Sequence, residues 1–371
     1  MQWLNSIESL DSNIIESDYP FLSKGFLRAL EATHNINGQT GWNSHHLFDD
    51  QNQYFAPAFI KHHSYGEYVF DWGWADAYQR HGIEYYPKLL LAAPFTPTEG
   101  NRIYSPNFEF NGQYLSAALH NHCAEENLSG CHILYCNNHE IDQLEGYGWH
   151  TRYSTQFHWY NYDYSDFDDF LKRFKSRKRK TVLKERQSIR EQNIDIQWIE
   201  GENITPEQWE FFYYCYQLTY AKRGMQGYIN LDGFKALQKE IAPQIQMVLA
   251  NKQNEPIACA LFFQDSKNLY GRYWGCTQDI PNLHFEVCYY QGIEYCIQHG
   301  LEHFDPGTQG EHKISRGFEP VFKRSLHYLR HKGFHDAVGS FVKEEYESLK
   351  IYKEECYRQL PFNDASCPEP K

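Results

Sequence analysis

The chain has 371 residues, a net charge of −13, ten scattered cysteines and an aromatic share of 17%. The charge excludes general affinity for nucleic acid, and no apolar run approaches the ~20 residues that cross a bilayer. Residues 1–13 carry neither a basic region nor an apolar core, so we expect no export, a cytoplasmic location and reduced thiols. The length exceeds one ordinary hydrophobic core and predicts two domains.

The first half of the chain alternates strands and helices. Apolar residues at helical spacing predict an amphipathic helix over 20–34. The further elements that the pattern predicts are strands at 54–59, 68–70, 85–93 and 131–136 and helices at 70–82 and 115–126. This order indicates an α/β domain over residues 1–165.

The second half, residues 166–371, repeats this order of elements. A strand at 153–164 joins the halves, and a long helix is predicted over 166–192. The later elements are helices at 205–222, 231–242 and 342–360 and strands at 246–250, 257–263 and 269–274. Because the two halves share one order of elements, the sequence predicts a duplicated fold.

Residues 281–320 contain the most informative stretch. Apolar residues at helical spacing from Phe285 predict a buried helix that ends at Gly300. A short strand at 301–304, a turn at 305–307 and a polar loop at 307–320 follow. Because α/β enzymes keep their chemistry in loops at the carboxyl ends of strands, we expect the active site here.

Five charged or titratable side chains lie in this loop: Glu311, His312, Lys313, Arg316 and Glu319. Lys313 and Arg316 can hold an anionic donor or a developing oxyanion, while His312 or Glu311 can take a proton from an amine. The alternative is a solvated loop with local ion pairs of little energetic value.

The start of the buried helix can add to this loop from the side. Glu286 lies one turn into the helix, where the dipole favours an ionised carboxylate that can serve as a general base, and His284 is its neighbour. Simple helix-end electrostatics is the alternative. Gly292 costs about 1 kcal/mol against Ala within a helix, so we expect close packing there.

A basic run stands out in this acidic chain, because residues 172–190 hold ten Lys and Arg against Glu185 alone. Such a stripe can contact the phosphates of a coenzyme or of an RNA such as tRNA. The alternative is one solvated helix face. The residues that we expect at phosphate are Lys175, Arg177, Lys178, Arg179 and Lys180.

Other motifs point to no further chemistry. The histidine pairs have neither the spacing of a zinc ribbon nor that of a His-Glu-x-x-His helix, so we expect no metal. The segment 143–148 matches a phosphate-loop pattern, but a strand follows it where a helix should begin. No Gly-x-Ser-x-Gly elbow or P-loop is present.

Several stretches resemble one known family. They include YPFLSKGFLRALE (19–31), TGWNSHHL (40–47), YVFDWGWADAY (68–78), YYPKLLLAAPFTPTEGNRI (85–103), FLKRFKSRKRKTVLKER (170–186) and HFEVCYYQGIEYCIQHGLEHFDPGTQGEHKISRGFEP (284–320). The chain resembles predicted N-acyltransferases labelled peptidoglycan biosynthesis/recognition proteins, a Fem-like branch of the GNAT superfamily. The resemblance implies an α/β fold of two tandem GNAT-like domains with mixed sheets flanked by helices. It also implies transfer of an acyl group to an amine, from aminoacyl-tRNA in Fem-type relatives or acyl-CoA in ordinary GNAT enzymes.

These observations lead to one hypothesis and one rival. The hypothesis is an N-acyltransferase that moves an acyl or aminoacyl group to an amine-bearing small molecule or peptide. Glu286 or His312 takes the proton, and backbone N–H groups of parting strands hold the acyl carbonyl. The rival is a non-catalytic protein of the same fold that recognises an amino-sugar or peptide, with Trp72 and Trp74 as stacking surfaces.

Overall fold

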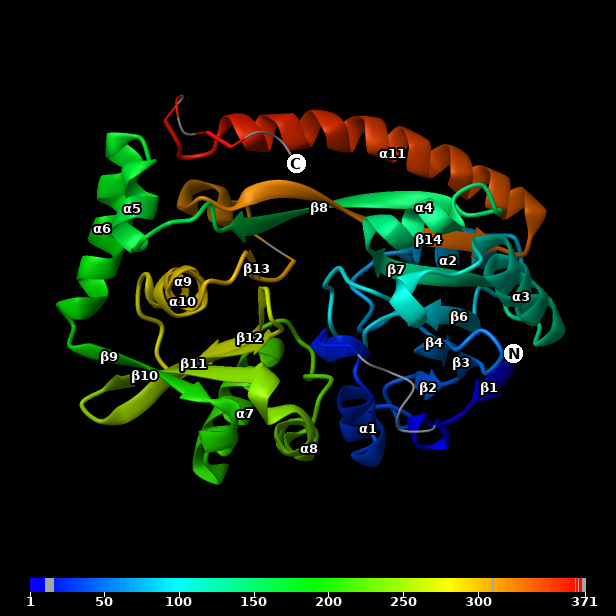
Figure 1. The fold of residues 1–371 in the computed structure, drawn as a ribbon, viewed down its shortest axis with the longest axis horizontal. Helices are drawn as coiled ribbons and strands as arrows, with labels where there is room; N and C mark the ends of the chain where they lie inside the picture. Colours follow the sequence, from blue (N-terminus) through cyan, green and yellow to red (C-terminus); the bar gives the residue numbers. More distant parts are fainter. Residues whose placement is uncertain (11–16, 309, 364, 366, 369–371) are drawn as a thin grey trace. The chain divides into compact units, whose positions relative to one another are not determined.

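The computed structural model describes residues 1–10, 17–308, 310–363, 365, 367 and 368, and it divides the chain into two units (Figure 1). The first unit comprises residues 1–154 and 322–351, and the second comprises 155–321 and 352–371. The predicted domain boundaries, 1–165 and 166–371, place residues 322–351 in the second domain, whereas the structure places them in the first unit.

The first unit contains a mixed sheet in the order β2-β5-β6-β7-β14 and a small sheet in the order β1-β3-β4. Only β6 and β7 pair in parallel within the larger sheet. Its strands are β1 (Gln2–Leu4), β2 (Trp42–Ser44), β3 (His46–Asp49), β4 (Tyr54–Ala56), β5 (Ala58–Lys61), β6 (Lys88–Leu91), β7 (Gly130–Cys136) and β14 (Glu319–Leu329), and its helices are α1 (Lys24–Ala32), α2 (Trp72–Arg80), α3 (Gly112–Glu125), α4 (Asn138–Leu144) and most of α11 (Lys332–Arg358).

The return of the chain to the first unit has a packing reason. The strand β14 pairs antiparallel with β7, so that Leu326 lies opposite Ile133. Val338 and Val342 of α11 then pack with Trp74 and Tyr78 of α2 in one apolar cluster. The helix predicted at 342–360 thus begins earlier, at Lys332.

A buried polar row crosses the sheet of the first unit. Lys61 and Lys88 lie directly opposite each other on β5 and β6, and both are buried. Lys88 Nζ donates to Glu67 Oε2 at 2.8 Å and to Asp71 Oδ2 at 2.5 Å. The prediction of a strand at 68–70 is wrong, because residues 62–71 form an irregular segment that turns these two carboxylates inward.

The same sheet also carries a histidine pair. His132 of β7 lies opposite His327 of β14, and their Nδ1 atoms are 2.8 Å apart. Burial lowers the pKa of His132 to about 3 and lowers that of His327 well below its usual range. Both imidazoles are therefore neutral at physiological pH.

The second unit contains a mixed sheet in the order β8-β13-β12-β11-β10-β9. Only β12 and β13 pair in parallel. Its strands are β8 (His150–Tyr160), β9 (Ile194–Glu200), β10 (Ile245–Lys252), β11 (Glu255–Gln264), β12 (Asn268–Cys276) and β13 (His303–Asp305), and its helices are α5 (Phe167–Lys172), α6 (Ser176–Arg190), α7 (Pro206–Ala221), α8 (Leu231–Ile241), α9 (Leu283–Phe285), a π-helical turn (Glu286–Tyr290), α10 (Gln291–His299) and a 3-10 helix (Glu311–Arg316).

Helices cover both faces of this sheet: α7 and α8 lie on one side of β10–β12, and α9 and α10 lie on the other (Figure 1). Local sequence explains several helix ends. Thr205 and Gln208 form a capping box at the start of α7, with Pro206 in the first turn. Gly300 ends α10 in the left-handed conformation, as predicted.

The long helix predicted over 166–192 is broken in the structure. Helix α5 ends at Lys172, and α6 begins at Ser176. Phe174 between them is buried, and it forms a β-bridge with Phe362 near the end of the chain. This pairing takes an apolar residue out of the helical pattern, so the chain turns there.

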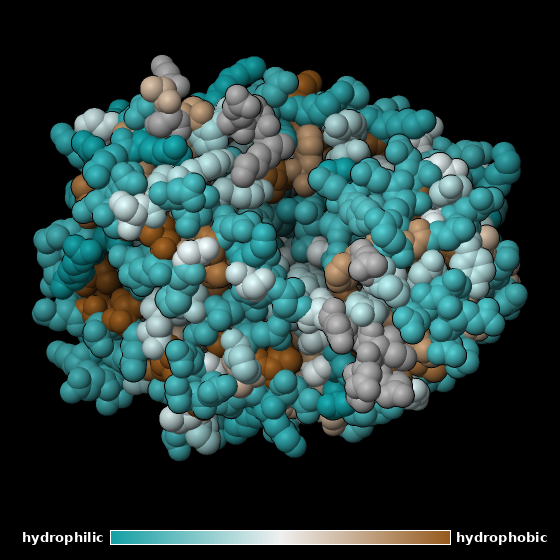
Figure 2. All heavy atoms as spheres, viewed as in Figure 1, coloured by the Kyte–Doolittle hydropathy of each residue, from teal (hydrophilic) through white to brown (hydrophobic). Residues whose placement is uncertain are grey.

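The larger prediction, an α/β fold with mixed sheets flanked by helices, is confirmed. The face of the molecule in Figure 2 is mainly hydrophilic, with hydrophobic side chains in small separate patches. The ten cysteines are free thiols.

Candidate functional site

The candidate site lies where two parallel strands of the second unit part. Pairing of β12 with β13 ends at Tyr270 and Asp305, whereas β12 continues to Cys276. A bulge interrupts β12 at this point, because Leu261 pairs with Tyr273 and Phe262 pairs with Gly271. Arg272 is the extra residue of the bulge. Bulges are frequent next to active sites, where they redirect side chains.

The bulged residue holds the end of β13 in place. Arg272 Nη2 lies 2.7 Å from Asp305 Oδ2, and both side chains are buried. The other oxygen of Asp305 accepts a hydrogen bond from the N–H of Gly307 at 2.9 Å. The turn that starts the polar loop is therefore fixed to the end of the sheet.

One wall of the site is the irregular helix at 283–299. Its middle turn, Glu286–Tyr290, is π-helical, which is common at functional sites because it shifts the direction of side chains. The residues that this helix contributes to the site are His284, Phe285 and Tyr289.

The polar loop forms a 3-10 helix, Glu311–Arg316, that begins after Gly310 and ends at Gly317. Gly317 has a φ of 89°, and a Cβ there would meet the ring of Phe170 at 2.8 Å. This close approach requires glycine. The loop residues that face the irregular helix are His312, Lys313 and Arg316; with His284, Phe285 and Tyr289 we call these six residues the His312 cluster.

His312 is the exposed member of the cluster. Its Nε2 lies 2.9 Å from the hydroxyl of Tyr289, and its ring contacts those of Phe285 and His284. Burial, together with the charges of Lys313 and Arg316, lowers the pKa of His312 to about 4. The imidazole is therefore neutral at pH 7 and accessible from outside.

Lys313 is buried beneath this surface. Its Nζ donates to the carbonyl of Gly307 and lies 5.8 Å from the centre of the Tyr289 ring. Burial lowers the pKa of Lys313 to about 7, although Asp305 opposes this shift. A fraction of Lys313 is thus neutral at physiological pH. Burial, and after it repulsion between a protonated His284 and the neighbouring His312, Lys313 and Arg316, lowers the pKa of His284 to about 3.

Arg316 connects the loop to helix α6. Its Nη2 lies 2.7 Å from Glu185 Oε1, and its Nη1 donates to the carbonyl of His312 at 2.7 Å. The guanidinium carbon lies 3.5 Å from the centre of the Phe285 ring. Glu185 also accepts a hydrogen bond from Tyr290.

Glu286 faces α6, where protein groups occupy both of its oxygens. Arg186 donates to Oε1 from Nη2 at 2.9 Å and to Oε2 from Nε at 3.2 Å, and Gln291 donates to Oε1. The carboxylate is 5% exposed and Arg186 7%. The role of Glu286 as a proton acceptor stays a prediction, and its position is that of a buried ion-pair partner.

The other predicted residues lie in three places. Glu311 is exposed and accepts a hydrogen bond at 2.6 Å from Tyr352. Trp72 and Trp74 belong to α2 of the first unit, where Trp72 is 39% exposed and Trp74 is buried against His327. Lys175 precedes α6, and the remaining residues expected at phosphate lie in its first turns: Arg177, Lys178, Arg179 and Lys180.

Sequence reasoning missed three features of the site. Tyr289 fits the apolar pattern of the helix, and its phenol in a run that contains histidines is the signal that marks a polar contact. Arg186 fits the basic stripe, yet it points inward to Glu286. Arg272 and Asp305 are 33 residues apart in sequence, and no local pattern joins them.

The described residues hold no group of three or more His, Cys, Asp or Glu side chains arranged to bind a metal ion. No helix among them is long and apolar enough to cross a membrane.

Comparison with solved structures supports the fold. The C-terminal domain of a putative lysylphosphatidylglycerol synthetase from Agrobacterium fabrum has a TM-score of 0.57 at 8% identity, over 90% of this chain and 94% of that one. L-PGS from Bacillus licheniformis has a TM-score of 0.52 at 8% identity, over 81% and 89%. FemX has a TM-score of 0.50 at 11% identity, over 85% and 94%. At sequence identities this low, the similarity supports the fold alone.

No curated protein matches the chain. A family model does match it, over residues 3–364, and is described as peptidoglycan biosynthesis/recognition. That range includes both units and the whole His312 cluster. The chain therefore belongs to the FemAB-like family of peptidoglycan biosynthesis/recognition proteins.

Proposed function

We propose that this protein is an N-acyltransferase and that the His312 cluster is its reaction site. The observation that carries the proposal is the position of His312, a neutral and accessible imidazole held by Tyr289 above two buried cationic groups. The cluster stands beside the point where β12 and β13 part and where Arg272 forms a bulge.

The proposed reaction is attack of an amine on an activated acyl carbonyl. A bond forms between the amine nitrogen and the carbonyl carbon, and the amine proton passes to His312. The bond to the leaving group then breaks, and that group takes the proton from His312. The acyl group ends on nitrogen, and the imidazole returns to its neutral form.

The buried cations Lys313 and Arg316 affect both the protonation of His312 and the stability of the oxyanion in this step. Before reaction, Lys313 and Arg316 disfavour a proton on His312, which keeps the imidazole available as an acceptor. When the tetrahedral oxyanion forms, its negative charge is stabilised by these cations and raises the affinity of His312 for the proton. Backbone N–H groups of β12 beyond Tyr270 are the proposed donors to the oxyanion.

The donor is proposed by chemical class as acyl-CoA or aminoacyl-tRNA. Thermal denaturation of the full chain with each class tests this, because a ligand at 100 times its Kd adds about 2.7 kcal/mol to stability. An increase of the midpoint with one class identifies the donor. The variant H312Q should lose that increase or lose transfer to a panel of amines. The control H299Q, which replaces an exposed histidine of α10 in the same unit, should lose neither. Equal transfer by H312Q and the wild type would reject His312 as the proton acceptor.

A second candidate is a non-catalytic protein that recognises an amino-sugar or peptide. The observation that favours it is the exposed ring of Trp72, which lies 5.1 Å from the ring of Tyr65 in the first unit. Tyr65 is 52% exposed, so both rings offer a face to a ligand. Quenching of tryptophan fluorescence by a muropeptide, lost in W72A and without turnover of any donor, would support this candidate over the first.

A further inference from the structure

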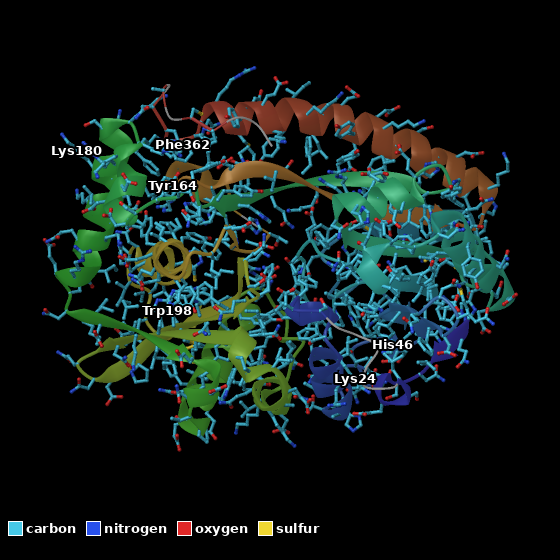
Figure 3. The ribbon with its side chains drawn as sticks, in the orientation of Figure 1. Lys24, His46, Tyr164, Lys180, Trp198 and Phe362 are labelled. Atoms are coloured by element: carbon cyan, nitrogen blue, oxygen red, sulfur yellow. The ribbon has the colours of Figure 1, made fainter. Side chains whose placement is uncertain are left out.

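The outward side of helix α6 is an unusual concentration of unpaired positive charge. Among the described residues, six cations of the helix have no carboxylate partner within ion-pair distance, although the chain carries a net charge of −13, and five of the six lie between Arg177 and Lys184. These five residues, which we call the α6 cations, are Arg177, Lys178, Arg179, Lys180 and Lys184. Figure 3 shows Lys180 on the outer side of the helix.

This charge distribution does not stabilise the helix itself. Lys175 provides no side-chain cap, and the first turn contains cations and no acidic residue, where the dipole favours anions. Arg177 and Lys180 are three residues apart, and Lys180 and Lys184 are four apart, so like charges are neighbours on one face. Both arrangements cost helix stability, which indicates that the charge is kept for an external partner.

The inward side of the same helix has the opposite character. Val182 and Ile189 are buried in the core of the unit, and Glu185 and Arg186 form ion pairs with Arg316 and Glu286. The helix thus separates a buried face that contacts the His312 cluster from a cationic face about 10 Å away, the diameter of a helix.

We propose that the α6 cations dock this protein on an anionic phospholipid surface. The exposed side chains of Arg177, Lys180 and Lys184 share one face and form a convex ridge that extends about 10 Å along the helix axis. A flat array of lipid phosphates contacts such a ridge without a groove, and each Lys or Arg near the surface strengthens attachment about fivefold. Leu183, 45% exposed between Lys180 and Lys184 in sequence, supplies an apolar side chain to the interface.

The alternative polyanion, RNA, fits this face less well. Single strands bind through aromatic side chains that stack on the bases, and no exposed large aromatic residue is found among the described residues of α5 and α6. The major groove of an RNA duplex is too narrow for side chains to read, so a single convex helix cannot enter it. The negative charge of the remaining surface repels an anionic bilayer and leaves α6 as the face that approaches it.

The test is co-sedimentation of the full chain with vesicles. We expect binding to vesicles with about one third phosphatidylglycerol, no binding to pure phosphatidylcholine vesicles, and release at high salt. The variant R177Q/K180Q/K184Q should bind about a hundredfold more weakly. The matched control K222Q/K239Q/K343Q removes the same charge at three exposed lysines elsewhere and should bind like the wild type.

A failure of this proposal can be distinguished from a failure of the proposed transfer reaction, because co-sedimentation needs no turnover. The α6 variant should melt no lower than the wild type, since it relieves repulsion between like charges. Equal binding by the wild type and the α6 variant, or no binding to anionic vesicles, would overturn the proposal. Binding of bulk RNA by α6 without binding of vesicles would overturn it as well and assign the face to nucleic acid.

Discussion

Glu185 is the only acidic residue within the basic run 172–190, and its carboxylate lies 2.7 Å from Nη2 of Arg316 on the polar loop. The two residues are 131 positions apart in sequence. Arg316 also donates to the carbonyl of His312, so Glu185 fixes the backbone of the residue that we propose as proton acceptor. Glu185 is therefore a positioning residue.

Replacing Glu185 by Gln should leave Arg316 buried without its counter-charge. We expect a loss of about 2 kcal/mol in the free energy of unfolding, the usual value of a hydrogen bond between charged groups. Chemical denaturation measures this, and hydrogen exchange should show faster exchange across residues 310–318. The matched control is E191Q at the C-cap of the same helix, which should change neither quantity because Glu191 is exposed. Unchanged exchange in E185Q would contradict the positioning role.

The ion pair between Arg186 and Glu286 allows a sharper test of whether Glu286 is structural. Removal of one partner, in R186M or E286Q, should cost about 3–5 kcal/mol because the other charge stays buried and unpaired. The double variant should lose much less than the sum of the two. A strictly additive double-mutant cycle would mean that the pair carries no coupling and would contradict the structural role of Glu286.

Replacing two helical glycines by alanine should change the stability of the protein in opposite directions. At Gly292 of α10, a Cβ would lie 2.5 Å from the ring of Phe304, so G292A should destabilise the protein by about 1–3 kcal/mol through overpacking. At Gly73 of α2, nothing lies within 4 Å, so G73A should stabilise it by about 0.5–1 kcal/mol. Thermal melts of both variants measure the difference. A stabilised G292A would refute the close packing of α10 on β13.

Stability should fall as pH drops below about 6.5. The folded-state pKa is lowered to about 3 for His132, about 3 for His284 and about 4 for His312. Between these values and the ordinary pKa of ~6.5, the unfolded chain binds protons that the folded chain does not. The contribution is complete above pH 6.5 and is lost as the pH falls toward 4 and then 3.

Denaturant titrations across this pH range measure the slope of the unfolding free energy. The variant H132Q removes one such group and should show a shallower decrease than the wild type. The control H62Q replaces an exposed histidine of the same unit and should keep the wild-type slope. An equal slope in all three proteins would show that His132 is not kept neutral by the fold.

The fold was predictable where local chemistry decides it. Pro206 after Thr205 and Gly300 after the apolar run mark helix ends in the sequence and in the structure. The strand β14 was missed because its eleven residues are paired with β7, far away in sequence, and their alternating pattern is interrupted by charged residues. The break before α6 depends on the distant Phe362, which no local pattern reveals.

The sequence could predict which residue types form the site, but it could not predict how their side chains are arranged. The density of charge around His312 marked the loop, and the structure brings His284, His312, Lys313 and Arg316 together there. Sequence spacing could not show that Arg186 points inward while Lys180 and Lys184 point outward, because all three look alike in a basic stripe. Which side of a helix is buried depends on partners such as Glu286, 100 residues away.

The late position of β14 in the chain affects how the protein can be made. Residues 1–154 of the first unit are translated before residues 155–321, and until those residues have been made the first unit lacks β14 and its His327. During this interval the edge of β7 stays unpaired and exposes backbone groups that invite wrong pairing. The first unit therefore cannot fold as soon as residues 1–154 are made, because it is completed only after the ribosome has produced residues 155–321 of the second unit.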